Sequence, residues 1–272
     1  MSDVRPIGVF DSGVGGISVL KELVKLMPHE NFIYFGDSAN APYGTKPRAV
    51  VEELTLATAD RLVGLGVKAL VIACNTATAA AVHLVRARYP ELPVIGIEPA
   101  LKPAVLHSPG GTIVVLATDV TLSEPKFARL LDTYRNQASI HTIGCPEIVP
   151  HVEAGDISSE ELDAYLTGRL LLALRHSDEA SEPEASDSDL LAHIDGVVLG
   201  CTHYPFIRGL LAGKLRSDCF IIDGGPGTAR EAARRLRAAD RLTSSEAEGR
   251  ITFLNSDPEK IALEEKLFCL PL

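Results

Sequence analysis

Short apolar segments alternate with helix-like segments along almost the whole chain, and this alternation limits the fold more than any other feature. In the first part of the chain the apolar segments predict the strands Ile7–Phe10, Asn31–Phe35, Ala69–Ala73 and Val94–Ile97. The segments between them have helical spacing and predict helices at about Ile17–Leu26, Val50–Leu65 and Thr76–Arg88. This alternation is typical of a parallel sheet with helices on both faces.

The second part of the chain repeats the first. Its predicted strands are Thr112–Ala117, Ser139–Ile143 and Gly196–Leu199. Residues at matching points of the two parts are separated by similar numbers of residues. The separation is 107 residues from Asp11 to Thr118 and 108 from Asp37 to Cys145. It is 127 residues both from Cys74 to Cys201 and from Ile95 to Ile222. The jump in spacing falls across an acidic, low-complexity stretch, residues 176–190, which is predicted to be an exposed insertion.

The repeat predicts the fold class. We expect two similar parallel-sheet α/β domains related by pseudo-twofold symmetry, with the active site in the cleft between them, because ligands of parallel sheets bind at the carboxyl ends of strands. The predicted first domain is discontinuous and comprises residues 1–98 and 206–272. The predicted second domain comprises residues 99–205 and carries the acidic insertion.

Composition excludes several classes of protein. The 272 residues carry a formal net charge of −10, which disfavours binding to nucleic acid or to an anionic membrane surface. Five cysteines without close spacing predict neither a disulfide framework nor a zinc site. No signal-peptide segment and no apolar run of membrane-spanning length is present in the sequence, so a cytoplasmic location is expected.

Two cysteines share a matched context. Cys74 follows Ala-Leu-Val-Ile-Ala and precedes Asn-Thr, whereas Cys201 follows Val-Val-Leu-Gly and precedes Thr-His. Each thiol therefore lies where a predicted strand ends, and a helix N-terminus there favours a thiolate. Two opposed thiols supply a base on one face of a carbon and an acid on the other, which is what inversion of an α-carbon requires. Buried cysteines are also common in strands, and the cysteines without this context are interpreted as structural: Cys145, Cys219 and Cys269.

Longer segments around these residues resemble the glutamate racemases of the Asp/Glu racemase family. They include Phe-Asp-Ser-Gly-Val-Gly-Gly from Phe10, Gly-Asp-Ser-Ala-Asn-Ala-Pro-Tyr-Gly from Gly36, Ala-Cys-Asn-Thr-Ala from Ala73, Pro-Val-Ile-Gly-Ile-Glu-Pro from Pro93, Cys-Pro-Glu-Ile-Val-Pro-His-Val-Glu from Cys145 and Gly-Cys-Thr-His-Tyr-Pro from Gly200. They occur in family order over nearly the whole chain. The chain departs from the family pattern at Leu122–Phe127 and at Asp223–Gly225.

The resemblance implies an isomerase that converts L-glutamate to D-glutamate for peptidoglycan synthesis, without cofactor or metal, and often as a homodimer. It implies that Cys74 acts on D-glutamate and Cys201 on L-glutamate. It further implies that Asp11 and His203 support the thiols, and that Asp37 and Glu153 assist in proton transfer. The substrate-binding residues that it implies are Asp11, Ser12, Tyr43, Gly44, Asn75, Thr76, Thr118, Thr121, Thr202 and His203.

Simpler interpretations of single residues stay open. Asp11 and Ser12 suit the cap of the following helix, Tyr43-Gly44 suits a turn, His203 suits a structural histidine, and Glu153 suits a solvated helix end. Three other functions also stay open for the chain. The first is an aspartate racemase with the same mechanism, and the second is a regulatory protein that binds and inhibits a partner. The third is a dinucleotide-binding oxidoreductase, because Gly13-Val-Gly-Gly follows a predicted strand, although the full G-x-G-x-x-G pattern is missing.

Overall fold

The computed structural model describes residues 3–175 and 186–272, and every strand in this part of the chain belongs to one of two parallel sheets. The chain divides into one unit of residues 1–98 and 224–272 and a second unit of residues 99–223. The predicted fold class, two parallel-sheet α/β domains, is confirmed. The predicted boundary after Pro205 differs from the observed one, because the strand Phe220–Asp223 pairs with Gly196–Leu199 and so keeps residues 206–223 in the second unit.

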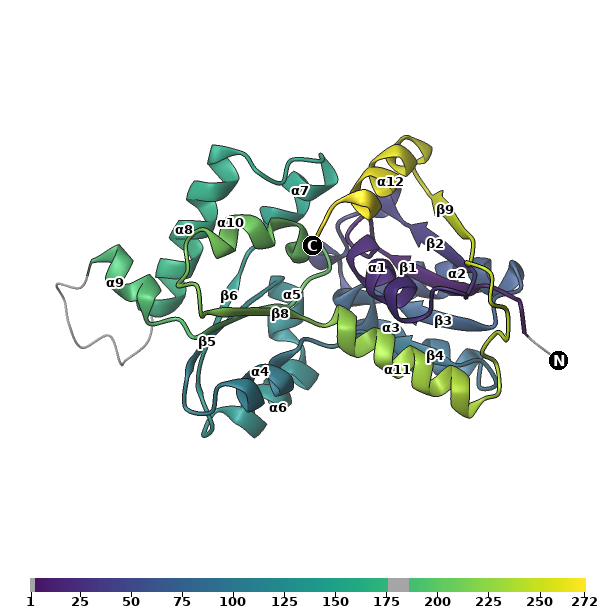
Figure 1. Ribbon diagram of the computed structural model, residues 1–272, viewed down its shortest axis with the longest axis horizontal. Helices are drawn as coiled ribbons and strands as arrows, with labels where there is room; N and C mark the ends of the chain where they lie inside the picture. Colours follow the sequence, from purple (N-terminus) through teal and green to yellow (C-terminus); the bar gives the residue numbers. More distant parts are fainter. Residues whose placement is uncertain (1–2, 176–185) are drawn as a thin grey trace. The chain divides into compact units, whose positions relative to one another are not determined.

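The first unit contains a five-stranded sheet in the order β4-β3-β1-β2-β9 (Figure 1). Its strands are β1 (Ile7–Asp11), β2 (Phe32–Gly36), β3 (Ala69–Ile72), β4 (Val94–Gly96) and β9 (Ile251–Asn255). The first four lie within one residue of the predicted strands at each end, and β9, which was not predicted, extends the sheet beyond β2. The carboxyl ends of β1, β2 and β3 therefore meet at one edge, where Asp11 ends β1 and Asp37 and Cys74 follow β2 and β3.

Helices cover both faces of this sheet. The helices are α1 (Ile17–Leu26), α2 (Arg48–Gly64), α3 (Asn75–Arg88), α11 (Gly225–Ala238) and α12 (Ile261–Cys269), with short 3-10 turns at η1 (Ser38–Asn40), η2 (Tyr43–Thr45) and η4 (Pro258–Lys260). Helices α2 and α3 pack together over Phe10, Leu70 and Ile72 to form a continuous apolar core. Helix α1 contacts both α11 and α12, so the C-terminal segment completes the N-terminal unit.

The second unit contains a four-stranded sheet in the order β6-β5-β7-β8. Its strands are β5 (Thr112–Ala117), β6 (Ser139–Gly144), β7 (Gly196–Leu199) and β8 (Phe220–Asp223). Helices α4 (Leu101–His107) and α6 (Pro125–Tyr134) cover one face, and α8 (Glu160–Arg175) packs against β6 from the other (Figure 1). The remaining helices are short: α5 (Asp119–Ser123), α7 (Ile148–Glu153), α9 (Asp187–Ala192), α10 (Arg208–Ala212) and η3 (Tyr204–Ile207).

The two sheets share one strand order, as the predicted repeat requires. Order β4-β3-β1-β2 corresponds to β8-β7-β5-β6, and the pairs Val71–Ile95 and Val198–Ile222 occupy matching registers, as expected from their common spacing. One detail of the predicted alignment is wrong. Asp11 pairs with Gly36 whereas Ala117 pairs with Gly144, so Ala117 and not Thr118 is the counterpart of Asp11. Ser12 is therefore the counterpart of Thr118.

The acidic stretch is described only in part. Residues 176–185 lie outside the described residues. Ser186 is the N-cap of α9: its hydroxyl accepts a hydrogen bond from the backbone N–H of Asp189, and the Asp189 carboxylate accepts one from the backbone N–H of Ser186, which forms a capping box. The last residues of the predicted insertion are thus helical. Within the described ranges no helix combines the length and apolar character needed to cross a membrane.

Candidate functional site

Cys74 lies at the start of α3, two residues beyond β3. It is the N-cap residue of that helix, and its Sγ accepts a hydrogen bond from the backbone N–H of Ala77 at 3.4 Å. The residue is only 5% exposed and its Sγ lies 3.6 Å from the hydroxyl of Ser12. Because the N-terminus of a helix carries partial positive charge, this position favours negative charge on sulfur.

Asp11 ends β1 and is completely buried. Its Oδ2 accepts a hydrogen bond from the backbone N–H of Gly16, the N-cap residue of α1, at 2.6 Å. A Cβ at Gly16 would lie 2.6 Å from the Cβ of Asp11, so glycine is required for this close approach. The carboxylate thus holds the backbone just before α1, although no side chain caps that helix, and Ser12 contacts the thiol.

Asp37, Asn40 and Tyr43 form a hydrogen-bonded group after β2. The Tyr43 hydroxyl donates to Asp37 Oδ2 at 2.7 Å, and the Asn40 amide donates to Oδ1 at 3.1 Å. Burial raises the pKa of Tyr43 far above its usual value, and the hydrogen bond to Asp37 raises it further, so the phenol stays protonated. The nearby Cys74 thiol also raises the pKa of Tyr43. Asn40 was missed by the sequence analysis although it lies inside the quoted segment.

The remaining predicted residues of this unit lie at the same edge of the sheet. Asn75 and Thr76 are the first two residues of α3, and Gly44 is in η2 beside Tyr43. Asn75 is 7% exposed, and its side-chain Oδ1 is buried without a hydrogen-bond partner. Buried polar atoms are normally satisfied, so this oxygen is suited to accept a hydrogen bond from a ligand.

Cys201 occupies the equivalent position in the second unit, two residues beyond β7. Its Sγ lies 3.7 Å from Nδ1 of His203, and Nε2 of His203 lies 2.7 Å from Oε1 of Glu153. His203 is buried and the Glu153 side chain is 13% exposed. Burial lowers the pKa of His203, but the hydrogen bonds with Cys201 and Glu153 outweigh it and raise that pKa well above its usual range. The three side chains thus form a thiol–imidazole–carboxylate series that favours an imidazolium in the middle.

Three predicted threonines follow strands of the second unit, and one of them contacts this series. Thr118 is the N-cap of α5, and its hydroxyl lies 3.0 Å from the hydroxyl of Thr121. Thr202 follows Cys201, and its hydroxyl lies 3.5 Å from Nδ1 of His203. All three side chains are buried. Their ligand-binding role stays a prediction.

Cys145 lies at the end of β6 and was interpreted as structural. Burial raises the pKa of its thiol to about 12, despite the opposing effect of the nearby Arg169 guanidinium. Its carbonyl accepts a hydrogen bond from the Tyr204 hydroxyl at 2.7 Å, and Arg169 donates to the carbonyl of Gly144. Tyr204 and Arg169 therefore fix the end of β6, and the structural interpretation of Cys145 fits a thiol that stays protonated.

A comparison with known protein families identifies the fold that carries these two thiols. Residues 7–232 match the family described as Asp/Glu/Hydantoin racemase. The chain belongs to this racemase family. The matched range includes both cysteines, His203 and Glu153, and reaches from β1 into α11.

Members of the racemase family resemble the chain over nearly its full length. A glutamate racemase of Clostridium botulinum (strain Alaska E43 / Type E3) is 45% identical and the alignment covers 97% of this chain and 96% of the relative. The crystal structure of Thermus thermophilus glutamate racemase in complex with β-chloro-D-alanine is 36% identical, with a TM-score of 0.72, and the match covers 98% and 94% of the two chains. The Francisella tularensis glutamate racemase in complex with D-glutamate is 29% identical, with a TM-score of 0.77 and coverage of 99% and 96%.

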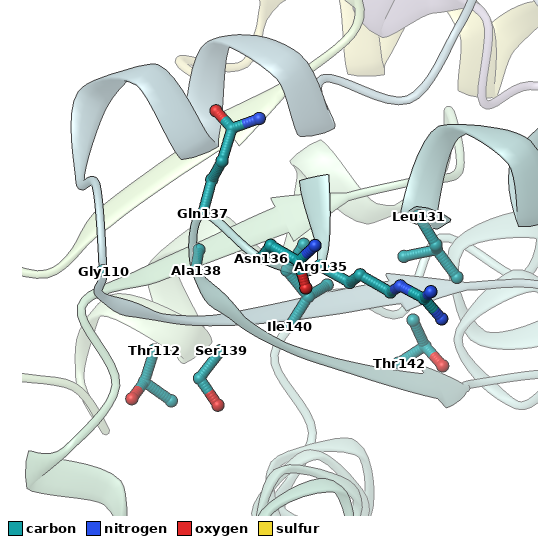
Figure 2. A pocket seen from close by; sticks show the side chains of 10 residues that line it. All are labelled: Gly110, Thr112, Leu131, Arg135, Asn136, Gln137, Ala138, Ser139, Ile140 and Thr142. Atoms are coloured by element: carbon teal, nitrogen blue, oxygen red, sulfur yellow. The ribbon is translucent and has the colours of Figure 1, made fainter. Parts of the chain in front are cut away.

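A surface hollow of about 640 Å³ lies elsewhere in the second unit of this racemase-family chain. Its lining includes Thr112 and Ser139, which begin β5 and β6, and extends along β6 as far as Thr142, whereas Cys145 follows the last residue of β6. Figure 2 shows that the lining side chains do not converge: Gln137 points away from Thr112 and Ser139, and Arg135 extends along the strand. The hollow therefore lacks the convergent polar groups that are typical of a ligand site.

Proposed function

We propose that this chain catalyses the cofactor-independent racemisation of glutamate by a two-thiol acid–base mechanism. The observation that carries the proposal is the matched placement of Cys74 and Cys201, each two residues beyond equivalent strands, β3 and β7. The names of the relatives, with 45% identity over 265 residues in the first of them, favour glutamate over aspartate as the substrate.

The proposed reaction consists of two proton transfers, one from the α-carbon and one back to it. With L-glutamate, the Cys201 thiolate removes the α-proton, so that a C–H bond breaks and an S–H bond forms. The Cys74 thiol then donates its proton to the opposite face of the same carbon and becomes a thiolate. With D-glutamate the two thiols exchange roles. General acid–base catalysis of this kind contributes roughly 10²- to 10⁴-fold to rate at each step.

The two thiols have different surroundings, which supports different roles. Cys201 faces His203, and the imidazolium favoured by Glu153 stabilises a thiolate by direct charge attraction. Cys74 has instead the N-terminus of α3 and the hydroxyl of Ser12. We propose that Asp37, which is held by Tyr43 and Asn40, assists on the Cys74 side, and that Glu153 assists on the Cys201 side.

The substrate-binding residues of the proposal carry hydroxyl, amide and backbone groups. Asn75 Oδ1, buried without a partner, is suited to accept a hydrogen bond from the substrate ammonium group. Backbone N–H groups at the start of α3 are suited to a carboxylate. The other proposed contacts are Asp11, Ser12, Tyr43, Gly44, Thr76, Thr118, Thr121, Thr202 and His203.

Circular dichroism of the purified protein with L-glutamate, D-glutamate and L-aspartate tests this assignment. The expected result is loss of the circular dichroism signal with both glutamate enantiomers and a far slower loss of signal with L-aspartate. Faster turnover of aspartate would identify an aspartate racemase. Cys74→Ala and Cys201→Ala are each expected to abolish racemisation in both directions, because each direction requires both thiols, and full activity in either variant would refute the mechanism.

The cellular role is part of the proposal. D-glutamate is the product expected to supply peptidoglycan synthesis, and a cell that lacks this chain is expected to need D-glutamate in the medium. The homodimer and the cytoplasmic location stay predictions, which light scattering of the purified protein and cell fractionation test. Growth of the deletion strain without D-glutamate, in the absence of a second racemase, would contradict the proposed role.

A further inference from the structure

The last turn of α7 contains a second histidine, His151, two residues before Glu153. We propose that His151, acting through Asp156, is a positioning residue that holds the Glu153 carboxylate against His203. This inference rests on the proposed function, since it assigns His151 a part in keeping the Cys201 side ready for proton transfer. His151 does not touch the reacting atoms and is not a catalytic residue.

Glu153 lies at the end of a short helix, where further support is needed to fix the direction of its side chain. Helix α7 has six residues, with Pro150 among them, and helices this short are not stable on their own. Glu153 is the last residue of α7, where the partial negative charge of the helix end disfavours a carboxylate. The 2.7 Å contact of Glu153 with His203 therefore depends on what fixes the end of α7.

Two hydrogen bonds join His151 and Asp156 across this helix end. The His151 carbonyl accepts from the backbone N–H of Asp156 at 2.9 Å, and His151 Nδ1 lies 2.6 Å from Asp156 Oδ2. Gly155 lies between them with a φ of +78°, a left-handed conformation that favours glycine and reverses the chain. The backbone and side-chain bonds together close a tight loop around Glu153.

Asp156 connects this loop to a much longer helix. Its Oδ1 accepts from the backbone N–H of Ser159 at 3.0 Å, and its Oδ2 accepts from the Ser159 hydroxyl at 2.6 Å. Ser159 in turn accepts from the backbone N–H of Leu162 in α8, which has 16 residues and packs against β6. The hydrogen bonds from Ser159 and His151 lower the pKa of Asp156 to about 2, so it remains an anion at neutral pH.

The effect of His151 on Glu153 passes through the backbone. Residues two apart on a helix point to different sides, so the His151 side chain does not support the Glu153 side chain directly. It instead fixes the rotation of the last turn of α7 relative to α8, and that rotation sets where Glu153 points. Loss of the His151–Asp156 bond is expected to weaken the Glu153–His203 contact and thereby the stabilisation of the Cys201 thiolate.

The experiment compares His151→Leu, which removes the donor, with His151→Asn, whose amide nitrogen occupies the position of Nδ1. His193→Leu is the matched control, because His193 is an exposed histidine of the same unit whose Nδ1 lies 2.6 Å from the Asp189 carbonyl, at the end of α9. H151L is expected to lower kcat roughly 10- to 100-fold with little change in KM, as misplacement of a supporting group does. H151N and H193L are expected to keep near wild-type kcat.

A second readout does not depend on turnover. The rate of iodoacetamide alkylation of Cys201, followed by mass spectrometry across a pH series, reports its thiolate. In H151L the half-maximal rate is expected to move to higher pH, and in H151N and H193L it is expected to stay. If H151L loses its native near-ultraviolet circular dichroism, Ser159→Ala, which removes one donor to Asp156, is expected to shift the same pH profile by a smaller amount.

The outcomes separate this inference from the proposed function. An unchanged kcat and alkylation profile in folded H151L, or equal losses in H151N and H151L, overturns the role of His151. A wild-type protein that does not racemise glutamate overturns the proposed function, whereas a shifted alkylation profile in H151L still supports the link from His151 to Cys201.

Discussion

At the scale of single residues, the hydrogen bonds with Cys201 and Glu153 together favour the charged form of His203. The raised pKa of His203 means that the imidazolium persists to higher pH than usual and is lost as pH rises through the raised value. Its contribution to stability is therefore complete below the unfolded pKa, about 6.5, and disappears on the alkaline side. Glu153→Gln is expected to lower kcat on the order of 100-fold and to move the alkaline limb of the kcat/KM profile to lower pH. A profile identical to that of the wild-type protein contradicts this assignment.

The cysteines also differ residue by residue in their expected reactivity. Burial raises the pKa of Cys145 to about 12 and that of Cys219 to about 11, so both remain thiols at pH values where enzymes work. Native protein treated with iodoacetamide at about pH 8, near the unperturbed thiol pKa, is expected to be modified at Cys201 before either of them. Peptide mass spectrometry measures this order. Faster modification of Cys145 than of Cys201 would show that the acid–base roles have been assigned to the wrong thiol.

At the scale of elements, the start of α3 gives Cys74 two roles that substitution separates. Serine is a good N-cap residue and alanine a poor one, with a difference of about 1 kcal/mol. The free energy of unfolding of Cys74→Ser, measured by urea denaturation, is therefore expected to be close to that of the wild-type protein. That of Cys74→Ala is expected to be about 1 kcal/mol lower. Neither variant is expected to racemise glutamate. Equal stability of the two variants would mean that a side-chain cap at position 74 does not stabilise the helix.

Elements were more predictable than the contacts between them. The strands Ile7–Asp11 and Gly196–Leu199 follow from continuous apolar runs, because a strand of a parallel sheet is buried on both faces. Strand β9 was not predicted, since its partly exposed Ile-Thr-Phe-Leu-Asn carries no such run. The role of Asp156 was also missed, because its partners His151 and Ser159 are defined by the shape of a turn and not by a spacing in the sequence.

At the scale of the whole molecule, the first unit must join two distant segments of the chain. Lys68 and Glu30 form a fully buried ion pair at 2.5 Å, and Glu30 also accepts from the backbone N–H of Thr243 at 2.7 Å. Lys68→Met leaves a buried carboxylate without its cation and is expected to cost about 3–5 kcal/mol of unfolding free energy. The double variant with Glu30→Gln is expected to regain part of that loss in urea denaturation. A Lys68→Met variant of wild-type stability would contradict the importance of the pair.

The shared strand order of the two units explains why the sequence predicted the site in outline. Each unit has a cysteine two residues after its third strand, and the repeat in the sequence indicates both positions. The domain boundary was predicted less well, because residues 206–223 carry few periodic signals and are assigned only by the pairing of β8 with β7.

The central claim is that two sulfurs act on opposite faces of one carbon. A crystal structure of the protein with D-glutamate bound measures this directly, through the distances from the substrate α-carbon to Sγ of Cys74 and Sγ of Cys201. The account predicts that both sulfurs flank the carbon at contact distance, roughly 3–4 Å each, so that they lie about 6–8 Å apart. A bound substrate with only one of the two sulfurs within reach of its α-carbon would contradict it.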